Sequence, residues 1–307
     1  MIPKLIVIEA PSILGLRPTE VERLPAALKR ANLLAELGAE HGGIIEPPSY
    51  DPKRDKTTLL LNLGAIRNYS VRLAGAVASA LEKDRFPLVL GGDCSILIGN
   101  LLALRRLRWY GLFFIDGHAD FYQPEAFLTG EVADMDLAIV SGRGPDILTN
   151  IDGLKPLVQD KNIVLFEYRD AKEAASYGSQ DVKESDICVF DYEAVRKLGI
   201  AKAAANALAR LLREELEGIW VHLDVDVLND TVMPAVDYRM KGGLTFKELV
   251  ELLQVLFRSG RVIGMDITIF NPDLDRDSSI ARDLASAIVG IGEVEDRRDF
   301  SYSSELY

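Results

Sequence analysis

Length, composition and charge exclude several classes of protein. The chain has 307 residues, of which 48% are hydrophobic, so it has ample material for a core. Its 47 acidic and 35 basic residues give a net charge of −12, which would repel nucleic acid and an anionic membrane face. No apolar run approaches a membrane span, residues 1–8 do not resemble a signal peptide, and two cysteines build no disulfide framework. We therefore expect a cytoplasmic protein that acts on a small molecule.

Strand-like apolar runs alternate with helical patterns along the chain. The first run spans residues 5–8, and a Thr19-x-x-Glu22 capping box then predicts a helix that ends near Gly38. A second capping box at Thr245 predicts a helix that ends near Gly260. Further strands are expected at residues 86–90, 112–115, 163–166, 187–190, 219–223 and 262–267, and further helices at about 66–83, 95–106, 201–216 and 277–289.

This alternation predicts an α/β fold with three α/β/α layers. Nearly continuous apolar strands are typical of a mostly parallel sheet that helices cover on both faces, here with about eight strands. The chain contains no linker, repeat or low-complexity tract, so residues 1–307 are expected to form a single domain. The polar stretch 293–307 is expected to be an irregular end or a subunit contact.

Three polar stretches directly follow predicted strands, at residues 91–95, 116–120 and 224–226. Open α/β sheets bind ligands at the carboxyl ends of their strands, so these stretches should lie together. Their sequences are GGDCS, DGHAD and DVD. They offer a thiol, an imidazole and several carboxylates, which indicates a metal site.

The second stretch places Asp116, His118 and Asp120 at alternate positions. If the strand continues, all three side chains point to one face and offer mixed oxygen and nitrogen ligands to one site. The alternative is a polar turn between the strand and a loop. Only three histidines occur in the chain, which favours the metal site.

The third stretch, Asp224-Val225-Asp226, follows a buried strand. Two like charges there repel each other and are poorly solvated unless a cation lies between them. His222 shares their face if the strand is regular, although a histidine in this setting is more often a core residue or a partner of a ligand than a ligand.

Cys94 follows a Gly-Gly-Asp turn and precedes a helix start. A thiol at a helix N-terminus has a lowered pKa, which suits metal ligation or nucleophilic attack. The alternative is a small buried thiol. Cys188 lies inside an apolar run and is expected to be a core residue.

Together, the three stretches resemble the arginase, agmatinase and formiminoglutamase family of ureohydrolases. GGDCS resembles that family's GGDHS, DGHAD its DAHxD and DVD its DxD. The resemblance covers most of the chain and implies the arginase-deacetylase-like fold. It also implies hydrolysis of a non-peptide carbon–nitrogen bond by hydroxide that bridges two Mn²⁺ ions, with Asp120 handing a proton to the leaving amine. The ligands implied are Asp116 and Asp224 as bridges, Cys94 and Asp120 for one ion, and His118 and Asp226 for the other.

Departures from the family pattern argue against an ordinary arginase. Cys94 replaces a metal-binding histidine, and its thiol favours Zn²⁺, Fe²⁺, Co²⁺ or Ni²⁺ over Mn²⁺ or leaves that position weakly filled. This cysteine makes the chain similar to N-omega-hydroxy-L-arginine amidinohydrolase. Ala133 stands where the family has a proton-shuttling histidine, and Ile269 where a glutamate binds the guanidinium. Lys172 stands where an acidic residue receives the substrate ammonium; the alternative is that it points to solvent.

The substrate loop of the family implies Tyr122 and Thr129, with Lys172 and Ile269, as substrate-binding residues. Three functions remain open: a hydrolase of an amidine, hydroxyguanidine, guanidine or amide; a non-catalytic arginase-fold metal-binding or assembly protein; and a single-metal amidohydrolase similar to deacetylases. A homo-oligomer is also open, because relatives range from monomers to trimers and hexamers.

Overall fold

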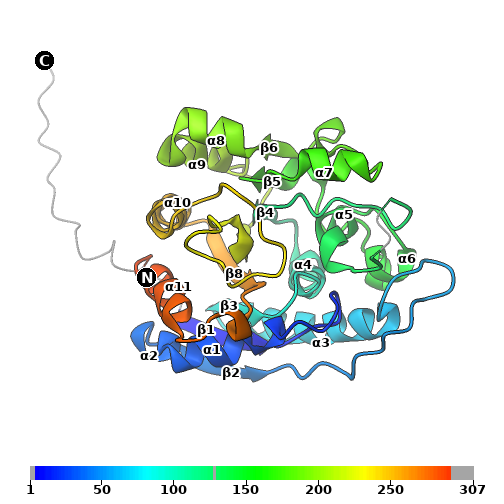
Figure 1. Ribbon diagram of the computed structural model, residues 1–307, viewed down its shortest axis with the longest axis horizontal. Coiled ribbons are helices and arrows are strands. Elements are labelled where there is room, and N and C mark those ends of the chain that lie inside the picture. Colours follow the sequence, from blue (N-terminus) through cyan, green and yellow to red (C-terminus); the bar gives the residue numbers. More distant parts are fainter. Residues whose placement is uncertain (1–3, 127–128, 292–307) are drawn as a thin grey trace, which may run out of the picture.

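Eight parallel strands form one sheet in the order β2-β1-β3-β8-β7-β4-β5-β6 (Figure 1). The computed structural model describes residues 4–126 and 129–291, so the polar stretch 293–307 lies outside the described residues. The predicted three-layer α/β fold is confirmed, and every strand pair in the sheet is parallel. The strands are β1 (Lys4–Ala10), β2 (Glu40–Ile44), β3 (Arg85–Gly91), β4 (Gly111–Ile115), β5 (Ile163–Phe166), β6 (Cys188–Phe190), β7 (Ile219–Asp224) and β8 (Val262–Thr268).

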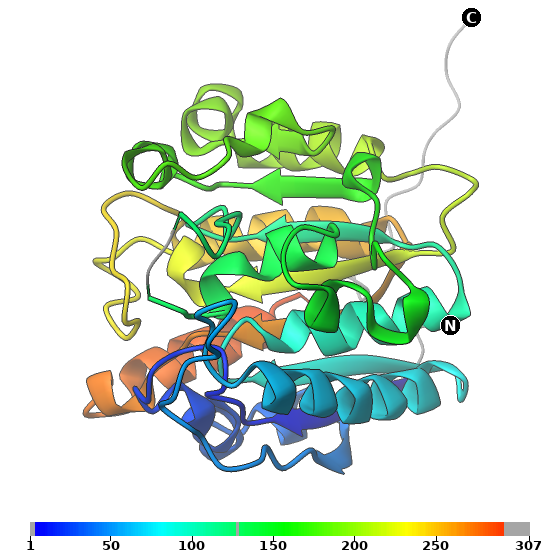
Figure 2. The ribbon, with the colours of Figure 1, turned by 90° about the vertical axis from the view of Figure 1, so that its right-hand side faces the viewer.

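Helices cover both faces of the sheet, and a hydrophobic cluster fills the space on each side (Figures 1 and 2). One face is covered by α1 (Leu24–Arg30), α2 (Leu33–Glu36), α9 (Ile200–Ala209), α10 (Phe246–Arg258) and α11 (Ser279–Val289). The other is covered by α3 (Leu63–Leu81), α4 (Ile96–Leu107), α5 (Asp136–Val140) and α6 (Asp146–Thr149). Two short helices, α7 (Ala171–Ser176) and α8 (Tyr192–Leu198), follow β5 and β6.

Some predicted boundaries differ from the structure. The capping box of α10 forms, since Thr245 Oγ1 accepts from the Glu248 amide at 3.2 Å and Glu248 Oε2 accepts from the Thr245 amide at 2.8 Å. The box expected at Thr19 does not form. There the backbone of Glu20 is left-handed, and α1 begins only at Leu24, with a proline in its first turn. Asn32 is also left-handed and separates α1 from α2.

The strand β2 was not predicted from the sequence. Its residues, EHGGI, contain no apolar run, because it pairs with β1 on one side only and lies at the edge of the sheet. Among residues 4–126 and 129–291, no helix combines the length and apolar character that a membrane crossing requires.

The central strands position the three polar stretches. β3, β8, β7 and β4 are neighbours in the sheet and parallel, so their carboxyl ends lie side by side. Two hydrogen bonds also hold the turn after β3 to the segment after β1. Ser12 Oγ donates to Asp93 Oδ2 at 2.8 Å, and the Asp93 amide donates to the Ser12 carbonyl at 3.0 Å. A Cβ on Gly92 would lie 1.8 Å from that carbonyl oxygen, so only glycine allows this close approach.

We predict that Gly92→Ala lowers the free energy of unfolding by about 1 to 3 kcal/mol, the usual effect of overpacking. Gly75→Ala is the matched control, because a Cβ on Gly75 of α3 meets nothing within 4 Å. Alanine in a helix interior should raise stability by about 0.5 to 1 kcal/mol. Urea unfolding measures both, and equal effects of the two variants would contradict the close approach at Gly92.

Candidate metal centre

A cavity of about 740 Å³ opens at the carboxyl ends of the central strands. Its floor is made by residues at or just after the ends of β3, β4, β7 and β8, so segments far apart in the sequence meet there. The residues from the three polar stretches and from the end of β8 that line it are Cys94, His118, Asp120, Asp224, Asp226 and Ile269.

The stretch after β4 does not continue the strand. β4 ends at Ile115, and the chain turns so that Asp116 Oδ1 accepts from the His118 amide at 2.6 Å. Asp120 adopts a left-handed backbone conformation, with φ at 44°, and lines the cavity. The expected alternation along a strand is therefore wrong, yet the turn brings ligand atoms of Asp116, His118 and Asp226 within 4.8 Å of one another.

The stretch after β7 is held by its own carboxylates. Asp224 Oδ1 accepts from the Asp226 amide at 2.7 Å, and Asp226 Oδ1 accepts from the Gly117 amide at 3.1 Å. Asp226 Oδ2 lies 2.8 Å from His118 Nδ1. These contacts join the second and third polar stretches into one cluster.

Cys94 completes the cluster from the turn after β3. Its side chain is only 1% exposed, and Sγ lies 3.0 Å from Asp224 Oδ2 and 3.1 Å from Thr268 Oγ1. Burial raises the pKa of this thiol well above its usual range, and the carboxylate of Asp224 adds to the increase. The expected lowering by the helix N-terminus is thus wrong for the metal-free protein, because burial and negative charge outweigh the helix dipole.

Burial also dominates the titration of the carboxyl groups. It raises the pKa of Asp116, Asp120 and Asp224 well above the usual range, and neighbouring carboxylates increase the effect. Burial alone would lower the pKa of His118, but the Asp226 carboxylate outweighs it and raises that pKa to about 9. In turn, His118 outweighs burial and lowers the pKa of Asp226. Without a metal ion, the two form an imidazolium–carboxylate pair.

The sequence prediction missed Asp136, although the repeat Asp134-x-Asp136 was visible in the sequence. Asp136 lies at the start of α5 and is fully buried, and in the part of the chain that the structure describes neither of its carboxylate oxygens has a hydrogen-bond partner. One of these oxygens lies within 4.8 Å of ligand atoms of Cys94 and Asp120. Acidic residues are abundant in this chain, so the repeat could not be distinguished from others by spacing alone.

Of the expected substrate-binding residues, Tyr122, Thr129 and Ile269 line the cavity and Lys172 does not. Lys172 is exposed in the first turn of α7, and its neighbour Glu173 faces the cavity instead. A one-residue difference on a helix turns a side chain by about 100°, so Lys172 is exposed, in line with the alternative that it points to solvent, and it adds no positive charge to the cavity lining.

A buried carboxylate, that of Glu131, links two residues that line the cavity. Glu131 Oε1 accepts from Arg17 Nε at 2.5 Å, and Glu131 Oε2 accepts from the Tyr238 hydroxyl at 2.8 Å. Arg17 and Tyr238 both line the cavity. Sequence reasoning did not identify these residues, because the three come from separate loops with no common motif.

Comparison with known proteins agrees with this geometry. The sequence model of the Arginase family matches residues 11–291, which includes all three polar stretches. The chain belongs to the arginase family. It is 30% identical to an arginase of Staphylococcus aureus (strain MRSA252) over 290 residues, which cover 92% of this chain and 94% of that protein. It is 29% identical to Homo sapiens arginase-1 over 279 residues, which cover 88% of this chain and 85% of that protein.

The fold comparison leads to the same family. The solved arginase of Bacillus caldovelox superposes with a TM-score of 0.83 at 27% identity, covering 94% of this chain and 97% of that one. Members of the arginase family are binuclear metal-dependent hydrolases, so the expectation of an enzyme of this family is confirmed.

We predict that the metal-free protein becomes less stable as pH rises. Burial raises the pKa of Asp134, a cavity residue, from 3.8 to about 8. Because its folded pKa is the higher one, its stabilising effect is complete below the unfolded pKa and is lost as pH rises through the folded pKa. Each such carboxyl should cost roughly 1.4 kcal/mol per pH unit within this window.

Thermal unfolding of metal-depleted protein between pH 4 and pH 8 measures this dependence. Asp134→Asn should flatten the fall in melting temperature, because the amide cannot ionise. A stability that is constant or rises over this range would contradict the prediction.

Proposed function

We propose that this protein is a two-metal hydrolase that cleaves a carbon–nitrogen bond in a small amidine, hydroxyguanidine, guanidine or amide. The observation that supports the proposal best is the convergence of Cys94, His118, Asp120, Asp224 and Asp226 in the lining of one cavity, with Asp116 grouped beside His118 and Asp226. It is consistent with membership of the arginase family.

The donor groups fit the proposed ions. Asp116 Oδ2 is buried and has no hydrogen-bond partner among the described residues. Burial also raises the pKa of Asp120, Asp136 and Asp224, as expected where a cation would offset the charge of neighbouring carboxylates. In this proposal Asp116 and Asp224 would be shared by the two ions, Cys94 with Asp120 would complete one position, and His118 with Asp226 would complete the other. Zn²⁺, Fe²⁺, Co²⁺ and Ni²⁺ suit the thiol better than Mn²⁺. Bound ions of this kind lower the pKa of a shared water and supply hydroxide near neutral pH.

The side chains around the ions would perform the remaining steps. Asp120 lies in the cavity wall and would accept a proton at a carboxylate oxygen and pass it to the leaving nitrogen. His118 and Asp226, paired at 2.8 Å, would fix each other's orientation. Because Ala133 lines the cavity where the family has a histidine, proton transfer would depend on Asp120 alone among the residues that we propose.

The cavity walls support a substrate other than arginine. Ile269 lines the wall and offers no carboxylate to a guanidinium, although it adopts a left-handed conformation with φ at 74° that is uncommon for a β-branched residue. Arg17 and Glu173 lie elsewhere in the lining, so the far end of the substrate meets both signs of charge. A neutral reacting group, such as an amide, fits the Ile269 wall best.

A single-metal hydrolase is the second candidate. The close grouping of Asp116, His118 and Asp226 would bind one ion without Cys94. The number of metal ions bound per chain distinguishes this candidate from the two-metal enzyme. A protein that binds no metal under any loading condition would contradict both.

We predict that Asp224→Asn abolishes binding of both metal equivalents and lowers activity about 100-fold or more, because Asp224 would be shared by the two proposed positions. Elemental analysis gives the metal content. Release of urea, ammonia or amine from a panel of hydroxyguanidines, amidines, guanidines, ureas and amides gives the activity. Asp146→Asn is the control, since Asp146 is exposed on α6 and pairs with Lys155. Full metal content in Asp224→Asn would contradict the bridging role.

We predict that Ile269→Glu increases kcat/KM for L-arginine roughly 10- to 100-fold, since a charge-assisted hydrogen bond to the guanidinium contributes about 1.5 to 3 kcal/mol. Ile269→Gln is the matched control because it has nearly the same shape without the charge. Urea release measures both variants. Equal gains in the two would show that charge at residue 269 does not select the substrate.

A further inference from the structure

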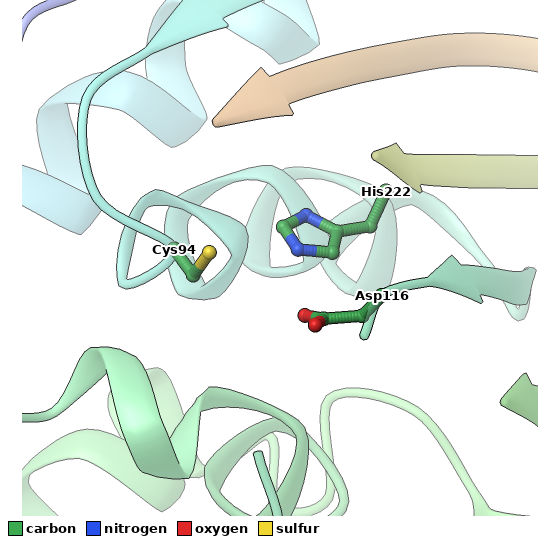
Figure 3. Close-up of side chains that lie close together, drawn as sticks. All are labelled: Cys94, Asp116 and His222. Carbon is green, nitrogen blue, oxygen red and sulfur yellow. The ribbon is translucent and has the colours of Figure 1, made fainter. Parts of the chain in front are cut away.

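A buried histidine lies close to the thiol of Cys94, near the carboxyl ends of the central strands. His222 belongs to β7 and is wholly buried, and its ring points toward Cys94 and Asp116 (Figure 3). One of its ring nitrogens lies within 4.8 Å of ligand atoms of both residues. The resemblance to the family assigned it no role.

The ring of His222 is oriented by Asp266 of β8. Asp266 Oδ2 lies 2.5 Å from His222 Nδ1, while Asp266 Oδ1 accepts from Asn100 Nδ2 at 3.1 Å and from Trp220 Nε1. A carboxylate can only accept hydrogen bonds, so Nδ1 of His222 donates to Asp266 and Nε2 is the nitrogen that faces the cluster. The Phe114 ring stacks on the His222 ring, with centroids 4.6 Å apart. The imidazole is therefore held in one orientation.

Nε2 of His222 has no hydrogen-bond partner within the described part of the chain. A buried polar atom that stays unpaired is destabilising. Carboxylate–histidine–metal triads share this arrangement: an acceptor holds one ring nitrogen, and the other faces the ion. The unpaired nitrogen, the thiol of Cys94 and the carboxylate of Asp116 together form a mixed donor set of the kind that Zn²⁺ prefers.

We infer that His222 is a metal ligand through Nε2 and supplies, from β7, an imidazole to the ion held by Cys94. The inference rests on the proposed two-metal function. The position would then combine sulfur, nitrogen and oxygen donors, which favours Zn²⁺ or Co²⁺ over Mn²⁺. Asp266 is a positioning residue, because it acts on the metal only through the His222 ring.

Nitrogen NMR of the full chain labelled with ¹⁵N-histidine tests the inference with His222 itself left unchanged. The chain has three histidines, and His41 on β2 is half exposed and far along the sheet, beside Glu9. On addition of two equivalents of Zn²⁺, the Nε2 resonance of His222 should move upfield by tens of ppm. One nitrogen of His118 should also shift, and both nitrogens of His41 should remain unchanged. His41→Gln and His118→Gln assign the signals, so His222 is identified by elimination.

Zn²⁺ binding that shifts His118 and leaves His222 unchanged would overturn the inference and leave the proposed function intact. No Zn²⁺ binding at all would overturn both. As a second measurement, Asp266→Asn should weaken Zn²⁺ binding at one of the two positions roughly 10- to 100-fold. Unchanged affinity at both positions, in a variant with wild-type circular dichroism, would also overturn it.

Discussion

Mutual repulsion of buried carboxylates at one edge of the sheet is the constraint on which the site depends. Asp116, Asp120, Asp136, Asp224 and Asp226 all lie there with little exposure to water. Within the described residues, the close positive partners of these carboxylates are few. His118 pairs with Asp226, and Arg169 donates to the Asp226 backbone carbonyl at 2.7 Å. Backbone amides in the turns at the strand ends donate to Asp116, Asp224 and Asp226 and hold their carboxylates in place. Because these contacts already fix the side chains, little reorganisation would be needed when a cation enters.

The proposed substrate selectivity would be separate from this charged floor. Apart from Cys94, the cavity-lining residues at which the sequence departs from the family pattern are Ala133 and Ile269, and elsewhere in the lining Glu131 links Arg17 to Tyr238. None of these side chains takes part in the hydrogen bonds that join the proposed ligands. A change of substrate could therefore evolve in the walls without disturbing metal binding, which is how one fold supports several chemistries.

Sequence alone predicted most of the sheet, because buried parallel strands are continuous apolar runs. It failed at β2, whose edge position demands no such run, and at Thr19, where a proline in the first turn of α1 shifted the helix start. The polar stretches were visible for the same reason as the strands, since they directly follow them. Lys172 and Glu173 show the limit: which of two neighbours faces the cavity depends on the rotation of a short helix, which a pattern of residues does not define. The environment of His222 depends on Asp266, 44 residues later.

The place of β8 in the sheet has a consequence for how the molecule is made. β8 is the last strand in the described chain, yet it lies between β3 and β7, and the residue after it lines the cavity. During synthesis from the N-terminus, the turns after β3, β4 and β7 are made before β8. In the finished sheet, β8 lies between β3 on one side and β7 and β4 on the other. The acidic edge therefore cannot close until β8 has inserted. Long-range pairing of this kind slows folding, so metal ions should bind late, as the final stabiliser of a nearly complete sheet.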